Sequence, residues 1–402
     1  MFPFPFEKMT SFGESGYSTQ YGFFNKSSIY SRNSKKEEKK ERPEIFSLIG
    51  IGDSIFDIIS EINIDLIKKY GLESNKTTYA NQNTIKIFDE IEAMPEVRYI
   101  PGGSIQNILR VLSCRLNQSD NNKIFNDNQK KKYKISMIGC VGDDDYKYKI
   151  YNSLVECGVS PFLEISKNER TSRCGVCIYN KKAYYIGDIV ASKNITKKFI
   201  SDNLKNILEH QGLLIEGYYL QYQFDICKDL CESFYNAKKL IVLTLNSSYV
   251  IKYYNEKVMD IANMSDIIYG NIEQAEELAE LKGVEIKKIF DRIFKKLIPK
   301  DRILVISNDI EGAYCSKYNY KENHLEFIMQ CFPQKIKSEE IVDNSGVGDS
   351  FLGGFLSEYL KGSSLYECLS MGNDTANVIL HNYGCTFPKN FEMKKFNHAF
   401  NH

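Results

Sequence analysis

The segment Asp343-Asn-Ser-Gly-Val-Gly-Asp349, followed by Ser-Phe-Leu-Gly-Gly-Phe-Leu, is the most informative stretch of this chain. Gly346 and Gly348 permit a tight turn with exposed backbone N–H groups, and a helical pattern begins directly after them. A helix N-terminus collects unpaired donors and partial positive charge, which suits a phosphate group. Asp349 is then either a helix cap or, beside a bound phosphate, a general base for an attacking hydroxyl.

Outward from this segment, short apolar runs alternate with amphipathic helical patterns from residue 44 onward. This alternation predicts an α/β fold, with a mostly parallel sheet and helices on both of its faces. Ligands bind such sheets at the carboxyl ends of the strands. The expected strands are 45–51, 133–139, 212–216, 240–245, 266–269 and 303–307, and the expected helices are 105–116, 146–157, 197–209 and 248–262. Two more runs, 174–179 and 183–190, predict a hairpin in a small second layer.

Composition excludes several classes of protein. The 402 residues include 52 Lys+Arg and 52 Asp+Glu, a balance that argues against a dedicated nucleic-acid binder. No apolar run approaches the roughly 18–20 residues of a membrane span. The 11 cysteines lack framework spacing, so we expect a reducing cytoplasm. Cys174-x-x-Cys177 has metal-type spacing, but a zinc site needs about four ligands and no second such pair exists.

The two ends of the chain and one internal insert differ from the rest. Residues 1–43 are rich in Ser, Phe, Tyr, Gly and Asn, end in a run of Lys and Glu, and show no periodicity, so we expect a disordered extension. Residues 117–132 are rich in Asn, Asp and Lys and predict an extended surface loop. We expect one folded domain over residues 44–393 and a short tail over 394–402.

Six collinear segments resemble one known family. Segment 343–349 is similar to the second signature of the ribokinase-like (pfkB) carbohydrate kinases, in which Asp-Thr-x-Gly-Ala-Gly-Asp forms an anion hole and supplies the catalytic base. Pro101-Gly-Gly-Ser-Ile-Gln-Asn107 resembles the Gly-Gly-Ser-x-Gln-Asn of the adenosine kinase branch of that family. The remaining matches are Gly139-Cys-Val-Gly-Asp143, Glu216-Gly-Tyr-Tyr-Leu220, Tyr269-Gly-Asn271 and Tyr383-Gly-Cys-Thr-Phe-Pro388. Collinearity over about residues 44–391 makes chance similarity a poor explanation.

The resemblance implies a ribokinase-like three-layer α/β/α domain with a small β-sheet lid, formed by discontinuous segments at about 60–100 and 172–192. It implies phosphorylation of the adenosine 5′-hydroxyl by ATP with Mg²⁺ to give AMP. Asp349 would be the base, and the backbone of Gly346, Val347 and Gly348 would form the anion hole. A cytoplasmic monomer that acts on small molecules, without nucleic-acid or membrane partners, is expected.

The resemblance also implies two sets of binding residues. Asp57 would accept hydrogen bonds from the ribose hydroxyls, and the base-pocket candidates Cys177 and Tyr219 are equally explicable as core residues. The substrate set is Asp53, Asp57, Gly102, Gly103, Ser104, Asn107, Cys177 and Tyr219. The ATP and magnesium set is Asn271, Gln274, Ser307, Asp309, Gly312, Asp343 and Asn344, with Mg²⁺ held through the phosphates and no dedicated protein cage.

Departures from the family pattern cluster on the ATP side. Gln274 stands where the family has Glu, and Glu273 is one residue out of register. Ala183 stands where many adenosine kinases have a lid arginine. The other departures are Val347 for Ala, Asn344 for Thr, and Ser307-Asn-Asp309 for Thr-x-Gly. Two alternatives therefore stay open: a pseudokinase that binds a nucleoside or a protein partner, and a kinase of the same fold for another nucleoside or sugar.

Overall fold

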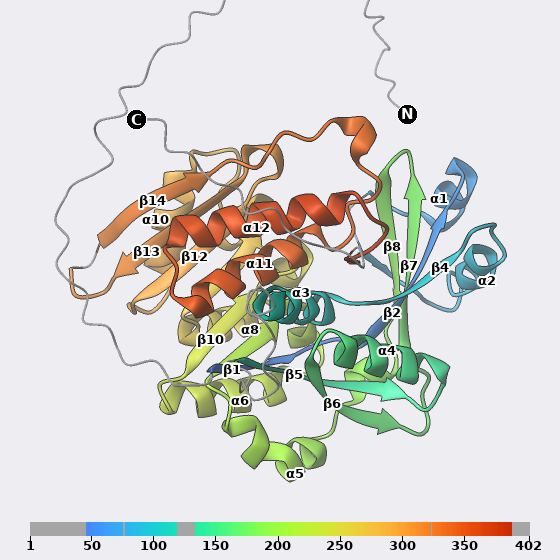
Figure 1. Cartoon of the computed structure of the whole chain (residues 1–402), viewed down its shortest axis with the longest axis horizontal. Coiled ribbons are helices and arrows are strands. Elements are labelled where there is room, and N and C mark those ends of the chain that lie inside the picture. The colour runs from blue at the N-terminus through green and yellow to red at the C-terminus, as the bar shows by residue number, and fades with distance from the viewer. Residues whose placement is uncertain (1–45, 75–76, 119–132, 323, 388–402) are drawn as a thin grey trace, which may run out of the picture. The chain divides into compact units, whose positions relative to one another are not determined.

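A nine-stranded sheet forms the centre of the computed structural model, which describes residues 46–74, 77–118, 133–322 and 324–387 (Figure 1). The strand order is β14-β13-β12-β11-β10-β9-β1-β5-β6, parallel from β12 to β6, with β13 and β14 antiparallel at one edge. The strands are β1 (Phe46–Ile51), β5 (Tyr133–Gly142), β6 (Val159–Ser166), β9 (Gly212–Glu216), β10 (Leu240–Thr244), β11 (Ile267–Asn271), β12 (Arg302–Ser307), β13 (Ala313–Asn319) and β14 (His324–Cys331).

Helices cover both faces of this sheet because the strands are apolar on both sides. On β9, Leu213 and Ile215 join one hydrophobic cluster, while Leu214 joins the other. The first cluster is completed by α5 (Lys197–Leu208), α6 (Phe224–Asn236), α7 (Ser248–Tyr253), α8 (Asn255–Met264), α9 (Ile272–Ala279) and α10 (Ile286–Lys296). The second is completed by α3 (Ser104–Gln118), α4 (Asp145–Glu156), α11 (Val347–Lys361) and α12 (Leu365–Leu380).

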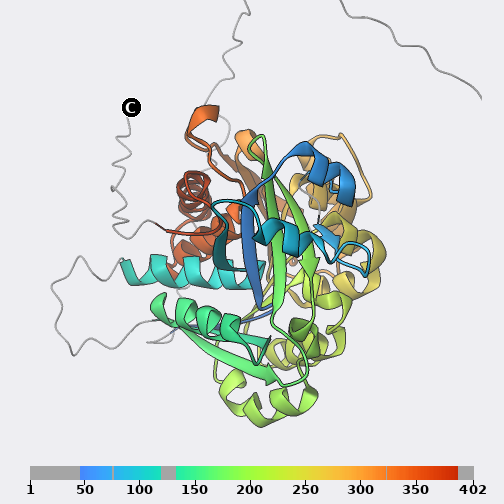
Figure 2. The ribbon, with the colours of Figure 1, turned by 90° about the vertical axis from the view of Figure 1, so that its right-hand side faces the viewer.

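The second layer is a five-stranded sheet in the order β3-β8-β7-β2-β4, on the right in Figure 1 and in front in Figure 2. Helices α1 (Ile64–Tyr70) and α2 (Ile87–Glu92) pack on its outer face around Ile58, Phe88 and Cys177. The hairpin predicted from the runs 174–179 and 183–190 is present in this sheet. Its turn is formed by Asn180 and Lys181, whose φ angles of 50° and 61° are those that a two-residue hairpin turn requires. The strands are β2 (Ile55–Glu61), β3 (Thr77–Tyr79), β4 (Arg98–Gly102), β7 (Ser172–Tyr179) and β8 (Lys182–Asp188).

The predicted α/β fold with a small second sheet is confirmed. Each expected strand is present with small shifts at its ends, and the expected helix over 248–262 is divided into α7 and α8 at Tyr254. The second sheet begins at Ile55, before the expected start near residue 60. The expected strands do not include β2, β3, β4, β6, β13 or β14; of these, β6 alone pairs in parallel with the strand before it, β5, across helix α4.

Residues 1–43 and 394–402, and nearly all of the 117–132 insert, lie outside the described residues. No helix in the described part of the chain is long and apolar enough to cross a membrane.

Helix α11 lies between α3 and α12, and two glycines allow this close packing. A Cβ atom on Gly353 would lie 2.6–2.9 Å from Val111 and from the carbonyl oxygen of Ile108 on α3. A Cβ atom on Gly354 would lie 2.5–2.9 Å from Thr375 and from the carbonyl oxygen of Met371 on α12. Backbone contact on both sides therefore determines the position of α11 and of the segment that precedes it.

Gly353→Ala should lower the free energy of unfolding by about 1–3 kcal/mol, because the added methyl group must displace α3 backbone atoms. Urea unfolding followed by circular dichroism measures this change. Gly187→Ala is the control, because a Cβ atom there meets only ordinary contacts of 3.5–3.7 Å. Equal stability of the two variants would contradict the close packing of α11 on α3.

Candidate active site

The loop before α11 presents the start of that helix at the carboxyl end of the sheet. Gly346 precedes the first residue of α11 and has a φ of 74°, which favours glycine. A Cβ atom on Gly346 would lie 2.7 Å from the Cβ of Cys385, so the segment after α12 packs directly against this loop. The first N–H groups of a helix lack partners within the helix. The backbone of Gly346, Val347 and Gly348 can therefore bind an anion.

A chain of hydrogen bonds holds Asp349 in the first turn of α11. Asn107 Nδ2 donates to Asp349 Oδ2 over 3.0 Å, and Arg110 Nη2 donates to Asn107 Oδ1 over 2.7 Å. Because Arg110 donates to the amide oxygen, the amide nitrogen of Asn107 must face Asp349. Burial raises the pKa of Asp349, while hydrogen bonds from Asn107 and Ser104 and the charge of Arg110 lower it. This carboxylate is fixed in orientation and suited to accept a proton.

Asp57 projects from β2 over the last residue of β4. A Cβ atom on Gly102 would lie 1.9–2.3 Å from the Asp57 carboxyl atoms, so only glycine leaves room for this side chain. Burial raises the pKa of Asp57 to about 7; Arg110 opposes this rise, and the Asp349 and Asp343 carboxylates add to it. The Asp57 and Asp349 carboxylates, predicted from two separate segments, thus both lie within electrostatic reach of the Arg110 guanidinium group.

Asp53 is buried and bonded on several sides. Its carboxylate accepts hydrogen bonds from the hydroxyls of Ser192 and Tyr222, and its N–H donates to Glu216 Oε2 over 2.6 Å. Burial raises the pKa of Asp53 to about 6, and burial beside Asp53 raises the pKa of Glu216 well above its usual range. A Cβ atom on Gly103 would lie 2.9 Å from the Asp53 carbonyl oxygen. Asp53 therefore connects the segments that carry Ser192, Glu216 and Tyr222.

Ser192, Tyr222 and the Glu216 carboxylate were not among the predicted site residues. Ser192 lies in a short 3-10 helix after β8, and Tyr222 directly follows another after β9. Nothing in the local sequence marks either residue, because its role depends on contact with Asp53 from a distant segment.

The structure does not bring Cys177 or Tyr219 into the site, which corrects that prediction. Cys177 pairs with Ser60 on the face of the second sheet opposite Asp57, and it packs beneath α1 and α2. Tyr219 is fully buried in the core, and its hydroxyl donates to the Ser192 carbonyl oxygen over 3.0 Å. Strand alternation places Cys177 on the outer face, and helical phase turns Tyr219 inward.

The second sheet contacts loops of the large domain on two sides. Tyr185 Oη lies 3.3 Å from Ser345 Oγ, and Lys181 Nζ donates to the Ser338 carbonyl oxygen over 2.8 Å. On the other side, Gln221 Nε2 donates to Tyr79 Oη over 2.9 Å. Ala183 is buried in an apolar cluster of the second sheet, so this position does not offer a charge. The loop before α11 is covered by this sheet, as a lid would cover it.

Two residues predicted on the ATP side are used for internal bonding. Gln274 forms a capping box with Asn271 at the start of α9, and its Nε2 donates to the Asn246 carbonyl oxygen over 2.7 Å. The Asp343 carboxylate accepts from Ser345 N and from Gly384 N, each over 2.8 Å. Asp343 thus organises the loop before α11. Asn344 follows it and is half-buried.

Other ATP-side residues remain close to the start of α11. Tyr269 Oη lies 3.1 Å from Ser307 Oγ, and a Cβ atom on Gly348 would lie 3.3 Å from the same hydroxyl. Asp309 is exposed, with a φ of 40°, and Gly312 has a φ of 83° in the turn between β12 and β13. A cavity of about 340 Å³ adjoins this turn, lined by Ile272, Glu276, Val284, Glu285, Ile286, Asn308, Glu311 and Tyr314.

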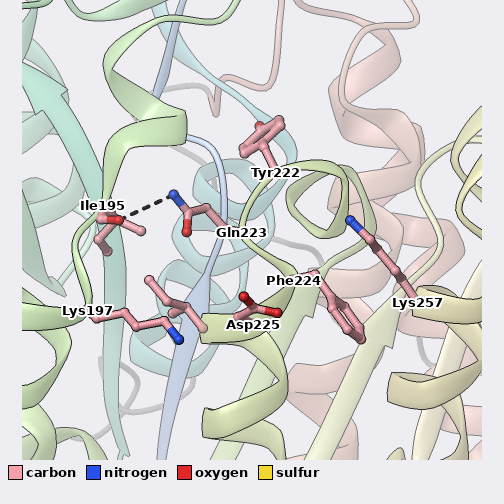
Figure 3. Close-up of a pocket in the computed structure, with 8 residues that line it drawn as sticks. Ile195, Lys197, Tyr222, Gln223, Phe224, Asp225 and Lys257 are labelled. Carbon is pink, nitrogen blue, oxygen red and sulfur yellow. Dashed lines mark hydrogen bonds between the residues drawn. The ribbon is translucent and has the colours of Figure 1, made fainter.

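A second, smaller cavity lies outside the carboxylate cluster (Figure 3). It has a volume of about 240 Å³ beside the start of α6. One of its walls, Tyr222, also bonds to Asp53. Its lining residues are Ile195, Lys197, Tyr222, Gln223, Phe224, Asp225, Ile226 and Lys257. Within the described ranges, no group of three or more His, Cys, Asp or Glu residues could hold a metal ion.

Comparison with known proteins identifies the family of this chain. The sequence profile described as "pfkB family carbohydrate kinase" matches residues 66–391. This chain belongs to the pfkB family. Adenosine kinase 2 of Arabidopsis thaliana is 22% identical over 351 residues, covering 85% of this chain and 96% of the relative. Adenosine kinase of Dictyostelium discoideum is 24% identical over 356 residues, covering 84% and 95%.

Solved structures of the family share the fold. Anopheles gambiae adenosine kinase, in complex with P1,P4-di(adenosine-5) tetraphosphate, superimposes with a TM-score of 0.75 at 23% identity, covering 85% of this chain and 98% of that one. A probable sugar kinase protein from Rhizobium etli superimposes with a TM-score of 0.71 at 17% identity, covering 86% and 96%. The pfkB fold therefore accommodates this chain over most of its length.

The raised pKa of Asp57 makes the ligand-free protein less stable as pH rises. The folded state keeps the Asp57 proton up to about pH 7, whereas the unfolded chain loses it near the ordinary aspartate pKa of 3.8. Since the folded state binds more protons between these values, stability falls from acidic to neutral pH. From pH 5 to pH 8, wild type should lose about 1–2 kcal/mol more unfolding free energy than Asp57→Asn. Urea unfolding at both pH values measures this difference.

Asp65→Asn is the control for this comparison, because Asp65 is exposed on α1 in the same layer. Its pH dependence should match that of wild type. Parallel pH profiles for wild type and Asp57→Asn would show that Asp57 is already ionised in the folded protein.

Proposed function

We propose that this protein is an ATP-dependent kinase that phosphorylates the 5′-hydroxyl of adenosine and gives AMP and ADP. The observation that carries the proposal is the orientation of Asp349 at the start of α11 by Asn107, beside the Asp57 carboxylate. A proton acceptor next to a helix N-terminus combines the two elements that phosphoryl transfer to a hydroxyl needs. Similarity to adenosine kinases over most of their length supports the choice of substrate.

Asp57 holds the ribose in this proposal. A carboxylate accepts two hydrogen bonds from vicinal hydroxyls, so the 2′- and 3′-hydroxyls are its natural donors. Because burial raises its pKa to about 7, these donors would favour the ionised form when substrate binds. Gly102 leaves room for the carboxylate and Gly103 allows the chain to pass close to the Asp53 carbonyl oxygen, while Ser104 and Asn107 bond to Asp349 nearby.

Asp349 takes the proton as the 5′-hydroxyl attacks the γ-phosphorus in line. The Asn107 amide keeps the carboxylate in position during this step. Negative charge that develops on the transferred group is stabilised by the backbone N–H groups of Gly346, Val347 and Gly348. The extra methyl groups of Val347, relative to Ala, do not alter these donors. The lid sheet excludes water above this space through Tyr185 and its neighbours.

ATP is proposed to extend from this helix start toward β11 and β12. Ser307 and Gly348 both adjoin the Tyr269 hydroxyl, so this hydroxyl links the anion hole to the β12–β13 turn. The cavity next to Asp309 and Gly312 offers space for the nucleotide base. Mg²⁺, when bound with the phosphates, neutralises charge on them. The residues fit a metal held mainly by phosphates, since Gln274 is bonded elsewhere.

A second function stays in consideration because of these ATP-side contacts. The Gln274 amide is hydrogen-bonded within a helix capping box, and Ala183 lies in an apolar cluster, so neither side chain offers a charge to ATP. A protein with these features could bind a nucleoside with little phosphoryl transfer. A sugar or another nucleoside as substrate is the other alternative, given the shared fold of sugar kinases. We further propose a cytoplasmic monomer without nucleic-acid or membrane partners.

Asp349→Asn should reduce turnover of adenosine with MgATP by about 10²–10⁴-fold, the usual contribution of a positioned base. Asp145→Asn is the matched control, because Asp145 is also in the first turn of a helix but is exposed and outside the site. A coupled assay of ADP formation measures both variants. Retention of more than a tenth of wild-type turnover by Asp349→Asn would remove Asp349 from the role of base.

A thermal-shift screen of nucleosides and sugars, with and without MgATP, tests the substrate class. Adenosine should raise Tm in wild type, since a ligand of the folded state stabilises it by mass action. Asp57→Asn and Gly102→Ala should each lose most of this rise, because one removes the acceptor and the other displaces it. Asp65→Asn should keep it. A rise with adenosine but no ADP formation in the assay would favour the pseudokinase, and a rise only with sugars would replace adenosine as substrate.

A further inference from the structure

Helices α3 and α4 lie side by side on one face of the large sheet (Figures 1 and 2). Near the active site, Arg110 Nη1 of α3 donates to Ser153 Oγ of α4 over 3.0 Å. One turn further along both helices, the thiol of Cys114 lies within hydrogen-bonding reach of the thiol of Cys157.

The residue after Cys157 confirms this register between the helices. A Cβ atom on Gly158 would lie 2.8 Å from Asn117 Nδ2 and 3.2 Å from Ser113 Oγ, on either side of Cys114 in the sequence. Gly158 adopts a φ of 80°, so the chain turns directly against α3 at this point. The two sulfur atoms are therefore brought together by backbone packing as well as by their own contact.

This pair differs from the other cysteines of the chain. All 11 cysteines lie in the described residues and carry free thiols, and eight of them are buried. Cys114 and Cys157 are half-buried, as is Cys174, so small oxidants can reach them. A hydrogen bond from Cys114, helped by the charge of Arg110, lowers the pKa of Cys157 to about 7, against burial. Burial raises the pKa of most of the others, for example to about 12 at Cys385.

We propose that Cys114 and Cys157 are a redox modification site, at which hydrogen peroxide closes a reversible disulfide between α3 and α4. The Cys157 thiolate attacks one oxygen of the peroxide, releases hydroxide and becomes a sulfenic acid. The Cys114 sulfur then attacks the Cys157 sulfur, the S–O bond breaks, and the hydroxide of the sulfenic acid leaves with the Cys114 proton as water. Two thiols and one peroxide thus give one disulfide and two waters.

The crosslink would join the helix that carries Asn107 and Arg110 to its neighbour, at a distance from the substrate space itself. In a reducing compartment the pair stays as thiols, and such disulfides are formed transiently. The crosslink would close a loop of roughly 40 residues in the unfolded chain, which restricts that state and favours the folded one. Formation of the bond does not depend on which substrate the kinase uses.

The test oxidises the full, reduced chain with a small excess of hydrogen peroxide, blocks the remaining thiols with N-ethylmaleimide and maps the peptides by mass spectrometry. We expect a crosslinked peptide pair that contains Cys114 and Cys157, lost again after dithiothreitol. The oxidised protein should melt a few degrees higher than the reduced protein, since a closed loop stabilises it.

Variants make this outcome decisive. Cys157→Ser and Cys114→Ala should each abolish the crosslink and the rise in Tm, and Tm of the reduced forms shows whether they fold. Cys385→Ala should keep both effects, although the Cys385 thiol lies within electrostatic reach of both cysteines of the pair. A crosslink through Cys385, or oxidation of wild type without any crosslink, would overturn the proposal.

Discussion

The buried residue Arg110 connects helix α3 to strand β4 of the second sheet and to helix α4. Its side chain is only 7% exposed, and it donates to the Pro101 carbonyl oxygen at the end of β4, to Asn107 on its own helix and to Ser153 on α4. A buried guanidinium group needs such partners because its desolvation is costly. The position of β4 in the second sheet, the orientation of Asp349 and the packing of α4 on α3 therefore all involve one side chain.

The same charge offsets the carboxylates that face it. Burial raises the pKa of Asp57 and of Asp349, the Asp349 and Asp343 carboxylates add to the rise at Asp57, and the Arg110 charge opposes both rises. Asp343 is stabilised by hydrogen bonds from the loop, whereas Asp57 and Asp349 face the space in which a hydroxylated substrate would lie. The zero net charge of the chain is compatible with phosphate chemistry, because backbone N–H groups at the start of α11 supply the attraction.

Local patterns predicted the large sheet well because each buried parallel strand is a short apolar run between polar turns. They predicted the second sheet only through its hairpin. Strands such as β4, which contains Pro101, and β2, which contains the half-buried Asp57, do not look like regular strands in isolation. These two strands form because they pair with each other. This pairing brings together segments that are separated in the sequence by helices α1 and α2.

Motif residues of the site followed from the sequence because glycine and aspartate at these positions carry out steric and chemical tasks that few residues can replace. Gly102 beside Asp57 and Gly346 before α11 are examples, where any Cβ atom would collide. Only the tertiary structure decided which other side chains belong to the site. Ser192 and Tyr222 reach Asp53 from distant loops, Cys177 faces the outer core, and Gln274 caps a helix. Such roles arise from contacts between distant segments, and a local pattern of residues does not contain them.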